Sequence, residues 1–486
     1  MKTLLSLLLL LLLSTAGSAA SPGRLIPDFI LPKVNSGGSR YWDLDFLPDA
    51  AASSNPGSMA ADEIAALPGQ PKKINGGRHY SGYVAVDEKA GRYFFYYFAE
   101  ASKNASGSPI FLWINGGPGC SSVGIGAFQE HGPLLVSPGG KSVRNSHHAW
   151  IQFGNVLYVD SPVGTGFSYS NTPSDYQTYT DATVAADNLR FLVNWFARFP
   201  EFAGREIYLA GEGYAGNYIP QLAKLILNRN RSLKSPSINL KGIILQNAVL
   251  DFLEDRLGFF DNLWSHGMIS LRMFSSIHKE CIKNSTSRAC FDSIEAASRV
   301  VAPLYMFDLT ANICNFTTAK LPIDEYYECR EKDVAAYLGS PEVQRALHVD
   351  PAKAPKKWAQ CNRDVAEAYG EITTSTSRIL ENLLSNNVSV LIYSGDAGAV
   401  VPAMSSRLSI RKLNLTKITL WHGWYMSITE VGGFSEGYRE GLSYATVRGA
   451  GHFVAKSKGP QLQALLKLYL SGGLPNSTIP AFSQGS

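Results

Sequence analysis

Short apolar runs that alternate with helical patterns constrain the fold of this chain more than any other feature. The runs have the length of buried strands and lie at 110–114, 156–159, 207–209, 242–245 and 388–393. Helical patterns such as 182–199 lie between them. This alternation predicts a mostly parallel central sheet that is covered by helices on both faces. Two aromatic and β-branched runs at 79–86 and 92–99 predict an antiparallel hairpin ahead of that sheet.

The strand rhythm also predicts how the chain is divided. Residues 21–75 are rich in Ser, Gly, Pro and Ala, which is typical of a loosely structured lead. Between about 251 and 338 the strand pattern stops and four of the six cysteines cluster, so we expect a disulfide-stapled cap inserted into the sheet domain. The expected units are a signal peptide at 1–20, the lead at 21–75, the sheet domain at 76–250 and 339–475, the cap at 251–338 and a tail at 476–486.

The first residues predict a secretory signal peptide. Lys2 precedes the apolar run 4–13, and the small residues at 16–20 supply a cleavage site near Ala19 or Ala20. The apolar run is about half as long as a membrane span, and no later segment is long enough to be one. We therefore expect no membrane span, and a destination that is either the exterior or the vacuole.

Composition argues against several function classes. The formal net charge of +4 is spread thinly and the densest basic stretch, 353–357, reads as a solvated loop, so we expect no nucleic-acid surface. Six cysteines in a secreted chain favour disulfides, and without a Cys-x-x-Cys or His-x-x-x-His pair we expect no metal and no cofactor. Sequons predict glycosylation at Asn104, Asn230, Asn284, Asn315, Asn387, Asn414 and Asn476.

Residues 211–216, Gly-Glu-Gly-Tyr-Ala-Gly, are built like a nucleophile elbow but carry no nucleophile. They follow the strand-like run 206–210 and precede 219–227, which reads as a helix. A strand, a tight turn of small residues and a helix hold the serine of α/β-hydrolases in strained geometry above the sheet. Gly213 occupies the centre of this turn. Glycine tolerates such backbone strain, so it permits the turn but provides no side chain that could act as a nucleophile.

Three further segments have the settings of catalytic parts. The run 113–122 leaves a strand and enters a glycine-rich turn, as an oxyanion hole requires, although an ordinary turn reads the same way. The missing Gly-Lys-Ser/Thr ending argues against a phosphate loop. The turn 394–402 stands where hydrolases place the carboxylate that orients a histidine, and His452 follows in a glycine-rich loop. This chain order, after the elbow, favours a catalytic histidine over a loop histidine.

Together these segments resemble the serine carboxypeptidase family over about 68–475. The block 159–169, Val-Asp-Ser-Pro-Val-Gly-Thr-Gly-Phe-Ser-Tyr, matches a signature of that family, and Trp424-Tyr425 followed by 430–433 is similar to its plant members. The resemblance implies an α/β-hydrolase fold with a helical cap and an activity that removes C-terminal residues from peptides. Relatives of this kind include acyltransferases and a hydroxynitrile lyase.

Carried over position by position, the family's catalytic serine falls on Gly213, its acid on Gly398 and its base on His452. Asp396 matches the first aspartate of the family's Gly-Asp-x-Asp turn, whereas the second aspartate is the catalytic one. The proline after the histidine loop is replaced by Ala455. Two of the three catalytic side chains are therefore absent.

The resemblance implies that the binding groups are retained. Gly117 and Tyr214 match the oxyanion donors. The group that recognises a peptide's terminal carboxylate matches Asn115, Gly116, Glu130 and Glu212. Carboxylates can hold another carboxylate only if they share a proton, which favours acid pH. The resemblance also implies the disulfides Cys120–Cys361, Cys281–Cys290 and Cys314–Cys329.

Three hypotheses about function follow. The first is an inactive carboxypeptidase homologue that binds peptide or protein C-termini, or an acyl-type small molecule, since loss of the serine alone costs about 10⁶ in turnover. The second is an altered carboxypeptidase, hydrolase or acyltransferase in which His452 activates water or another acceptor, with Asp396 as its partner. The third is a sequence error or a deliberate inactivation, against which the loss of both catalytic residues argues. A homodimer is a further possibility.

Overall fold

The computed structural model describes residues 57–232, 238–284, 287–312 and 330–474. The expected signal peptide, the first part of the expected lead, the expected tail, Cys314, Cys329, Asn315 and Asn476 lie outside the described residues.

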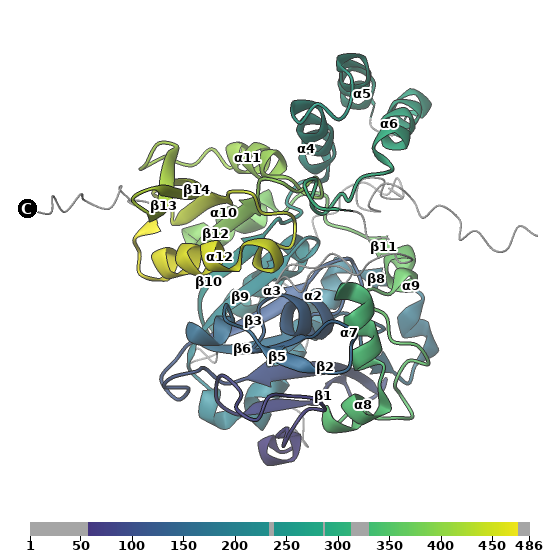
Figure 1. Ribbon diagram of the computed structural model, residues 1–486, viewed down its shortest axis with the longest axis vertical. Helices are drawn as coiled ribbons and strands as arrows, with labels where there is room; N and C mark the ends of the chain where they lie inside the picture. Colours follow the sequence, from purple (N-terminus) through teal and green to yellow (C-terminus); the bar gives the residue numbers. More distant parts are fainter. Residues whose placement is uncertain (1–56, 233–237, 285–286, 313–329, 475–486) are drawn as a thin grey trace, which may run out of the picture.

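One large mixed sheet organises the chain (Figure 1). In spatial order its strands are β1 (His79–Asp87), β2 (Arg92–Ala99), β6 (Asn155–Val159), β3 (Ile110–Asn115), β9 (Glu206–Glu212), β10 (Asn239–Gln246), β12 (Ser389–Gly395), β15 (Leu442–Val447), β14 (Glu430–Gly437) and β13 (His422–Ser427), and β7 (Tyr169–Ser170) pairs with β2. The six strands from β6 to β15 run parallel, and the strands outside them are antiparallel. The predicted parallel centre and the predicted β1–β2 hairpin are therefore both present.

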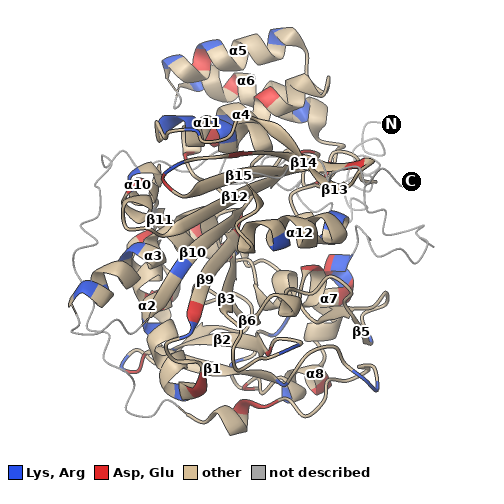
Figure 2. Ribbon diagram, turned by 90° about the vertical axis from the view of Figure 1, so that its left-hand side faces the viewer, with Lys and Arg blue, Asp and Glu red and all other residues tan. Residues whose placement is uncertain are grey.

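Helices cover both faces of this sheet, as Figure 2 shows with α2, α3 and α10 on one side and α7 and α12 on the other. Outside the cap the helices are α2 (Asp181–Arg198), α3 (Ala215–Ser232), α7 (Arg330–Leu338), α8 (Pro341–Ala346), α9 (Arg363–Ala368), α10 (Ser377–Ser385), α11 (Ala403–Lys412) and α12 (Val454–Leu470). The shorter elements are η2 (Met59–Asp62), η3 (Val123–Glu130), β4 (Leu134–Val136), β5 (Val143–Asn145), η4 (Trp150–Gln152), η5 (Pro173–Tyr176), β8 (Tyr179–Thr180), η6 (Pro200–Phe202) and β11 (Tyr369–Glu371).

The two-residue period of the strands explains the two layers. In β3, Ile110, Leu112 and Ile114 join the core beneath α2 and α3, whereas Phe111 and Trp113 join the core beneath α7 and α12. Because successive strand side chains point to opposite faces, a fully apolar run buries both faces at once. This is why the central runs read as continuously apolar in the sequence.

The helix α2 shows how local sequence sets an element's ends. The Thr180 hydroxyl accepts from the backbone N–H of Thr183 at 3.1 Å, while the Thr183 hydroxyl accepts from the Thr180 N–H at 3.2 Å. This reciprocal pair satisfies two N–H groups that the first turn leaves unpaired. Asp181 in the first turn and Arg198 in the last turn complement the helix dipole.

The cap consists of α4 (Phe252–Ser265), α5 (Leu271–Lys283) and α6 (Arg288–Val301), which project from one end of the sheet in Figure 1. It has its own apolar core, and the disulfide Cys281–Cys290 joins α5 to α6. The helix α7 falls within the range that we expected for the cap, but its buried face belongs to the sheet core. In the expected lead, Ile64 and Leu67 are buried in that same core.

Candidate active site

The elbow lies between β9 and α3, and Gly213 has the positive φ of +61° that such a turn requires. The Gly213 N–H donates to the carbonyl of Gln246 at 3.1 Å, and the Val249 N–H donates to the Gly213 carbonyl at 2.8 Å. The last residue of β10 and the segment that follows it therefore hold the turn on both sides. A Cβ atom at Gly213 would lie 3.4 Å from His452 Nε2, which is ordinary contact. The backbone thus keeps a place for a side chain that would face the histidine.

His452 is held in one orientation and one protonation state. Its Nδ1 lies 2.8 Å from the Val400 carbonyl oxygen. A carbonyl can only accept, so Nδ1 carries the proton and Nε2 is left as an acceptor toward Gly213. Burial lowers the pKa of His452 to about 4, so the ring is neutral at physiological pH.

The backbone around Gly398 leaves no room for a side chain. A Cβ atom at Gly398 would lie 2.8 Å from the backbone N of His452 and 3.1 Å from the carbonyl oxygen of Phe307. These are backbone atoms, which cannot move aside as the tip of a side chain can. The same Phe307 carbonyl accepts from the His452 N–H at 2.6 Å, so the segment after α6 is fastened against the histidine loop.

Asp396 does not take the acid's place. Its Oδ1 accepts from the backbone N–H of Gly449 at 2.6 Å, in the turn that precedes the histidine. The proton on His452 Nδ1 is donated to the Val400 carbonyl instead. The side chain of Asp396 therefore shapes the loop, and a backbone carbonyl orients the imidazole.

The two candidate oxyanion donors come from loops in direct contact. A Cβ atom on Gly116 would collide with the backbone N of Tyr214, so only glycine lets the loop after β3 approach the elbow this closely. Within the described ranges, neither the Gly117 N–H nor the Tyr214 N–H has a hydrogen-bond acceptor. Two such N–H groups beside the nucleophile position can stabilise a developing oxyanion or hold a carbonyl oxygen.

Buried polar side chains surround the other side of the elbow. Asn115 Nδ2 donates to Glu212 Oε1 at 3.2 Å, and Gln246 Nε2 donates to Glu212 Oε2 at 2.5 Å. Glu212 Oε1 also lies 3.7 Å from His452 Nε2. Trp113 Nε1 donates to Asn115 Oδ1 at 2.6 Å, which fixes the orientation of that amide. The carboxyl of Glu212 is therefore held firmly next to Gly213 and His452.

Glu130 and Glu212 titrate as an interacting pair. Burial raises the pKa of Glu130 to about 7, an effect that Gln246 and the charge of Lys456 partly offset. Burial, followed by the negative charge of Glu130, raises the pKa of Glu212 well above its usual range. Glu212 therefore keeps its proton while Glu130 ionises first. Below neutral pH the pair carries protons that it can share with a bound carboxylate.

Sequence reasoning missed two members of this cluster, Gln246 and Tyr393. The Tyr393 hydroxyl donates to Gln246 Oε1 at 2.6 Å, which turns the amide nitrogen of Gln246 toward Glu212. Gln246 ends an otherwise apolar strand, and polar residues at the carboxyl ends of parallel strands face the ligand-binding edge of the sheet. The position of Gln246 at the end of an apolar run could therefore have identified it from the sequence.

A disulfide fastens the glycine-rich turn of the site. It joins Cys120, just after Gly117, to Cys361, which precedes α9, across a sequence separation of 241.

No cluster of three or more potential metal ligands occurs in the part of the chain that the structure describes. The helices found there are also too short or too polar to cross a membrane.

The sequons differ in their surroundings. The side chains of Asn104, Asn284, Asn387 and Asn414 are exposed. Asn230 is half-buried and its Nδ2 donates to the Ile238 carbonyl at 2.7 Å, so a glycan there would displace this hydrogen bond.

Comparison with known proteins gives one consistent result. Residues 68–472 match the family model described as serine carboxypeptidase. The chain is 40% identical over 426 residues to serine carboxypeptidase-like 29 of Arabidopsis thaliana, covering 85% of this chain and 88% of that protein. It is 41% identical over 444 residues to serine carboxypeptidase-like 40 of the same plant, covering 87% of each. A prohormone-processing carboxypeptidase of Saccharomyces cerevisiae has a similar fold, with a TM-score of 0.75 at 22% identity over 86% of this chain and 97% of that one.

Proposed function

Because this chain belongs to the serine carboxypeptidase family, we propose that it binds the free C-terminal end of peptides without cleaving them. A single observation carries the proposal. The nucleophile position is Gly213, while the polar cluster of Asn115, Glu130 and Glu212 beside it is buried and ordered. The site therefore retains the side chains that would bind a peptide terminus but has no nucleophilic side chain at residue 213.

The shared proton explains how an acidic cluster can hold a carboxylate. When Glu130 and Glu212 are both protonated, their O–H groups donate to the oxygens of the peptide terminus, and Asn115 adds an amide donor. An amidated terminus lacks the negative oxygens that accept these hydrogen bonds. Ionisation of Glu130 near pH 7 places a negative charge against the ligand, so affinity falls as pH rises through that range.

Calorimetry with one peptide in its acid and amide forms tests this proposal at pH 5.5 and pH 8. We expect the acid form to bind more tightly at pH 5.5 and to weaken by about tenfold at pH 8, which is one unit above the pKa of Glu130. Glu130→Gln keeps a neutral group at the position that ionises near pH 7, so this variant should bind less pH-dependently. Equal affinity for the acid and amide forms would mean that the cluster does not recognise the carboxylate.

A second candidate function is favoured by the orientation of His452. Its Nε2 is an acceptor that faces the place of the missing serine, and the N–H groups of Gly117 and Tyr214 lie beside the same place. Water there can attack an ester carbonyl carbon while Nε2 takes the water's proton. The proton then passes to the departing alcohol, and the acid is released.

Hydrolysis of an activated aryl ester distinguishes the two candidates. Base and oxyanion donors without a nucleophile support roughly 10³ to 10⁴ over the uncatalysed rate. His452→Ala should abolish that rate, whereas His422→Ala on strand β13 should not change it. If both variants lose the same small amount of activity, surface histidines account for the reaction and only the binding function stands.

The same proposal includes passage through the secretory route. The N-terminal pattern and the exposed sequons at Asn104, Asn387 and Asn414 support it. A loss of apparent mass on treatment with an endoglycosidase, and an N-terminus near residue 21 in the mature protein, are the expected results. Sedimentation of that mature protein tests whether it is a homodimer.

A further inference from the structure

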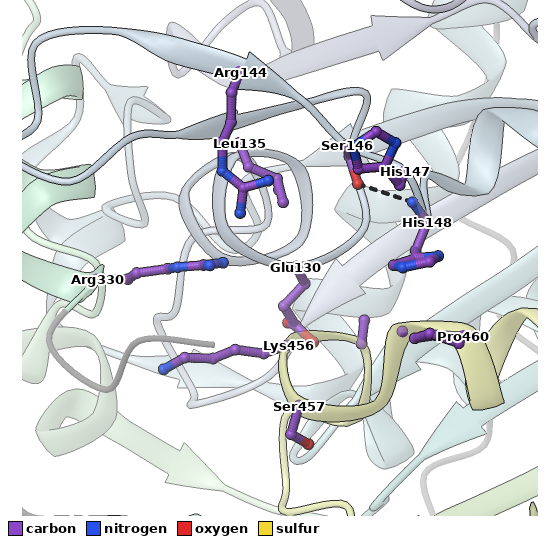
Figure 3. A pocket seen from close by; sticks show the side chains of 12 residues that line it. Glu130, Leu135, Arg144, Ser146, His147, His148, Arg330, Lys456, Ser457 and Pro460 are labelled. Carbon is purple, nitrogen blue, oxygen red and sulfur yellow. Dashed lines mark hydrogen bonds between the residues drawn. The ribbon is translucent and has the colours of Figure 1, made fainter. Parts of the chain in front are cut away.

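Glu130 belongs to two places at once. It contributes to the carboxylate cluster of the elbow, and it also lines a cavity of about 70 Å³ (Figure 3). The cavity lies between the end of η3, the β4–β5 region, the start of α7 and the first turn of α12. Its volume is sufficient for a small polar group of a ligand.

The cavity has a cationic lining. Arg144 from β5 and Arg330 from α7 point toward it in Figure 3, and Glu130 is the one acidic group among the described lining residues. Lys456 from α12 also lines the cavity, but its amine is directed away and lies over the Phe453 ring. Among the described lining residues, three therefore carry a positive side chain and one carries a carboxyl group. Arg330 and Lys456 are only 5% and 7% exposed, so their charges act through a low-dielectric surrounding.

Glu130 is placed to serve both sides. It is 3% exposed, and among the described residues neither of its carboxylate oxygens has a partner in good hydrogen-bond geometry, although Gln246, Glu212 and Asn115 lie near enough to influence its pKa. A buried oxygen without a partner is costly, and groups of this kind are expected where a ligand completes the bonding. Glu130 interacts with Glu212 of the elbow cluster and also lines the cavity, so this one side chain connects the two sites.

We infer that this cavity accepts the acidic side chain of a peptide that ends in Asp or Glu. The inference rests on the proposed binding of peptide C-termini and specifies which peptides are preferred. The two carboxyl groups of a terminal Asp or Glu are separated by only a few bonds, and the two places that would receive them share Glu130. The terminal carboxylate would lie at Asn115 and Glu212, and the side-chain carboxylate would lie between Arg144 and Arg330, with the charge of Lys456 nearby.

Matched peptides that differ only in the last residue test the inference at pH 6. At this pH the peptide's Glu side chain is largely ionised and Glu130 largely protonated. We expect a peptide ending in Glu to bind about tenfold more tightly than one ending in Gln, since charge-assisted hydrogen bonds are the strong ones. A peptide ending in Lys should bind more weakly than either.

Substitutions locate the effect. Lys456→Met and Arg144→Gln should each reduce the ratio of affinities for the Glu and Gln peptides to about threefold or less, while binding of the Gln peptide changes little. Lys467→Met, on the exposed face of the same helix α12, is the control and should leave the ratio unchanged. Thermal melting of each variant shows whether it is folded, and the two cavity variants test the inference independently.

Two outcomes would overturn the inference. Equal binding of the Glu and Gln peptides, with both bound more tightly than their amides, would refute the acidic preference and leave the proposed function intact. Binding of free glutarate as tightly as the Glu peptide, with the same loss in Lys456→Met, would make the cavity a site for small acids rather than a side-chain pocket. Failure of every peptide to bind better than its amide would instead refute the proposed function itself.

Discussion

Introducing a serine at the elbow, by Gly213→Ser, should produce a reactive but weak nucleophile. The Cβ atom of the new side chain would lie 3.4 Å from His452 Nε2, and its hydroxyl extends one bond farther. Because the Val400 carbonyl holds the proton on Nδ1, Nε2 is already the acceptor that a serine hydroxyl requires. The variant therefore gains a nucleophile and a base in contact.

The structure allows an estimate of the loss of stability in Gly213→Ser and of its rate of acylation. A non-glycine residue at a φ of +61° costs about 1 to 2 kcal/mol, which for a chain of this length lowers the melting temperature by about 1 to 2 °C. A backbone carbonyl orients the imidazole but does not stabilise its charged form as a carboxylate does. Loss of that carboxylate costs about 10⁴ in turnover, so we expect acylation that is slower than in a complete triad by about this factor.

Labelling by a phosphonofluoridate, followed by peptide mass spectrometry, is the assay. Gly213→Ser should be labelled at residue 213, whereas Gly213→Ala has the same backbone strain without an Oγ and should remain unlabelled there. Wild-type protein should also show no label in this turn. A folded Gly213→Ser protein that resists labelling would refute the inferred direction of His452 Nε2.

Adding Gly398→Asp should not complete the triad. Its Cβ atom would meet backbone atoms of His452 and Phe307, so we expect a further loss of stability and no further gain in labelling rate. Recovery of full turnover in the double variant, without a lower melting temperature, would show that the loop adjusts and that the steric argument is wrong.

Three further predictions concern stability and the loops. Glu130→Gln should gain stability relative to wild type as pH rises from 5 to 8. Burial raises the pKa of Glu130 to about 7 in the folded protein, so the wild type is stabilised by that proton at low pH and loses this stabilisation as pH rises toward 7. Urea unfolding should show a relative change of about 2 to 3 kcal/mol, and parallel pH curves for the two proteins would contradict the raised pKa. Replacing Cys120 and Cys361 together by Ala should lower the free energy of unfolding by up to about 5 kcal/mol, since the bond closes a loop of 241 residues, and an unchanged value would argue that the bond does not form. Asp396→Asn keeps the acceptor for the Gly449 N–H, so it should cost less than about 1 kcal/mol and leave any ester hydrolysis unchanged; loss of that hydrolysis would assign Asp396 a role at His452.

Local chemistry explains why the sequence was sufficient to predict the central strands and the elbow of this protein. The central strands were predicted from short apolar runs, because a strand buried on both faces must be apolar at every position. The elbow was predicted from its small residues, because a left-handed turn between a strand and a helix admits few others. The lack of a nucleophilic side chain at Gly213 could be recognised from the order of residues in that turn alone.

Long-range geometry explains what the sequence did not reveal. The proton on His452 Nδ1 goes to the Val400 carbonyl rather than to Asp396, and no residue pattern distinguishes these acceptors across some fifty positions. Glu130 and Lys456 are over three hundred residues apart and become neighbours only when η3 and α12 pack on one face of the sheet. The pKa of Glu130 depends on that packing, since burial and nearby charge, not residue type, displace a pKa from its usual value. A sequence specifies which groups are present, and the tertiary structure decides which of them share a proton.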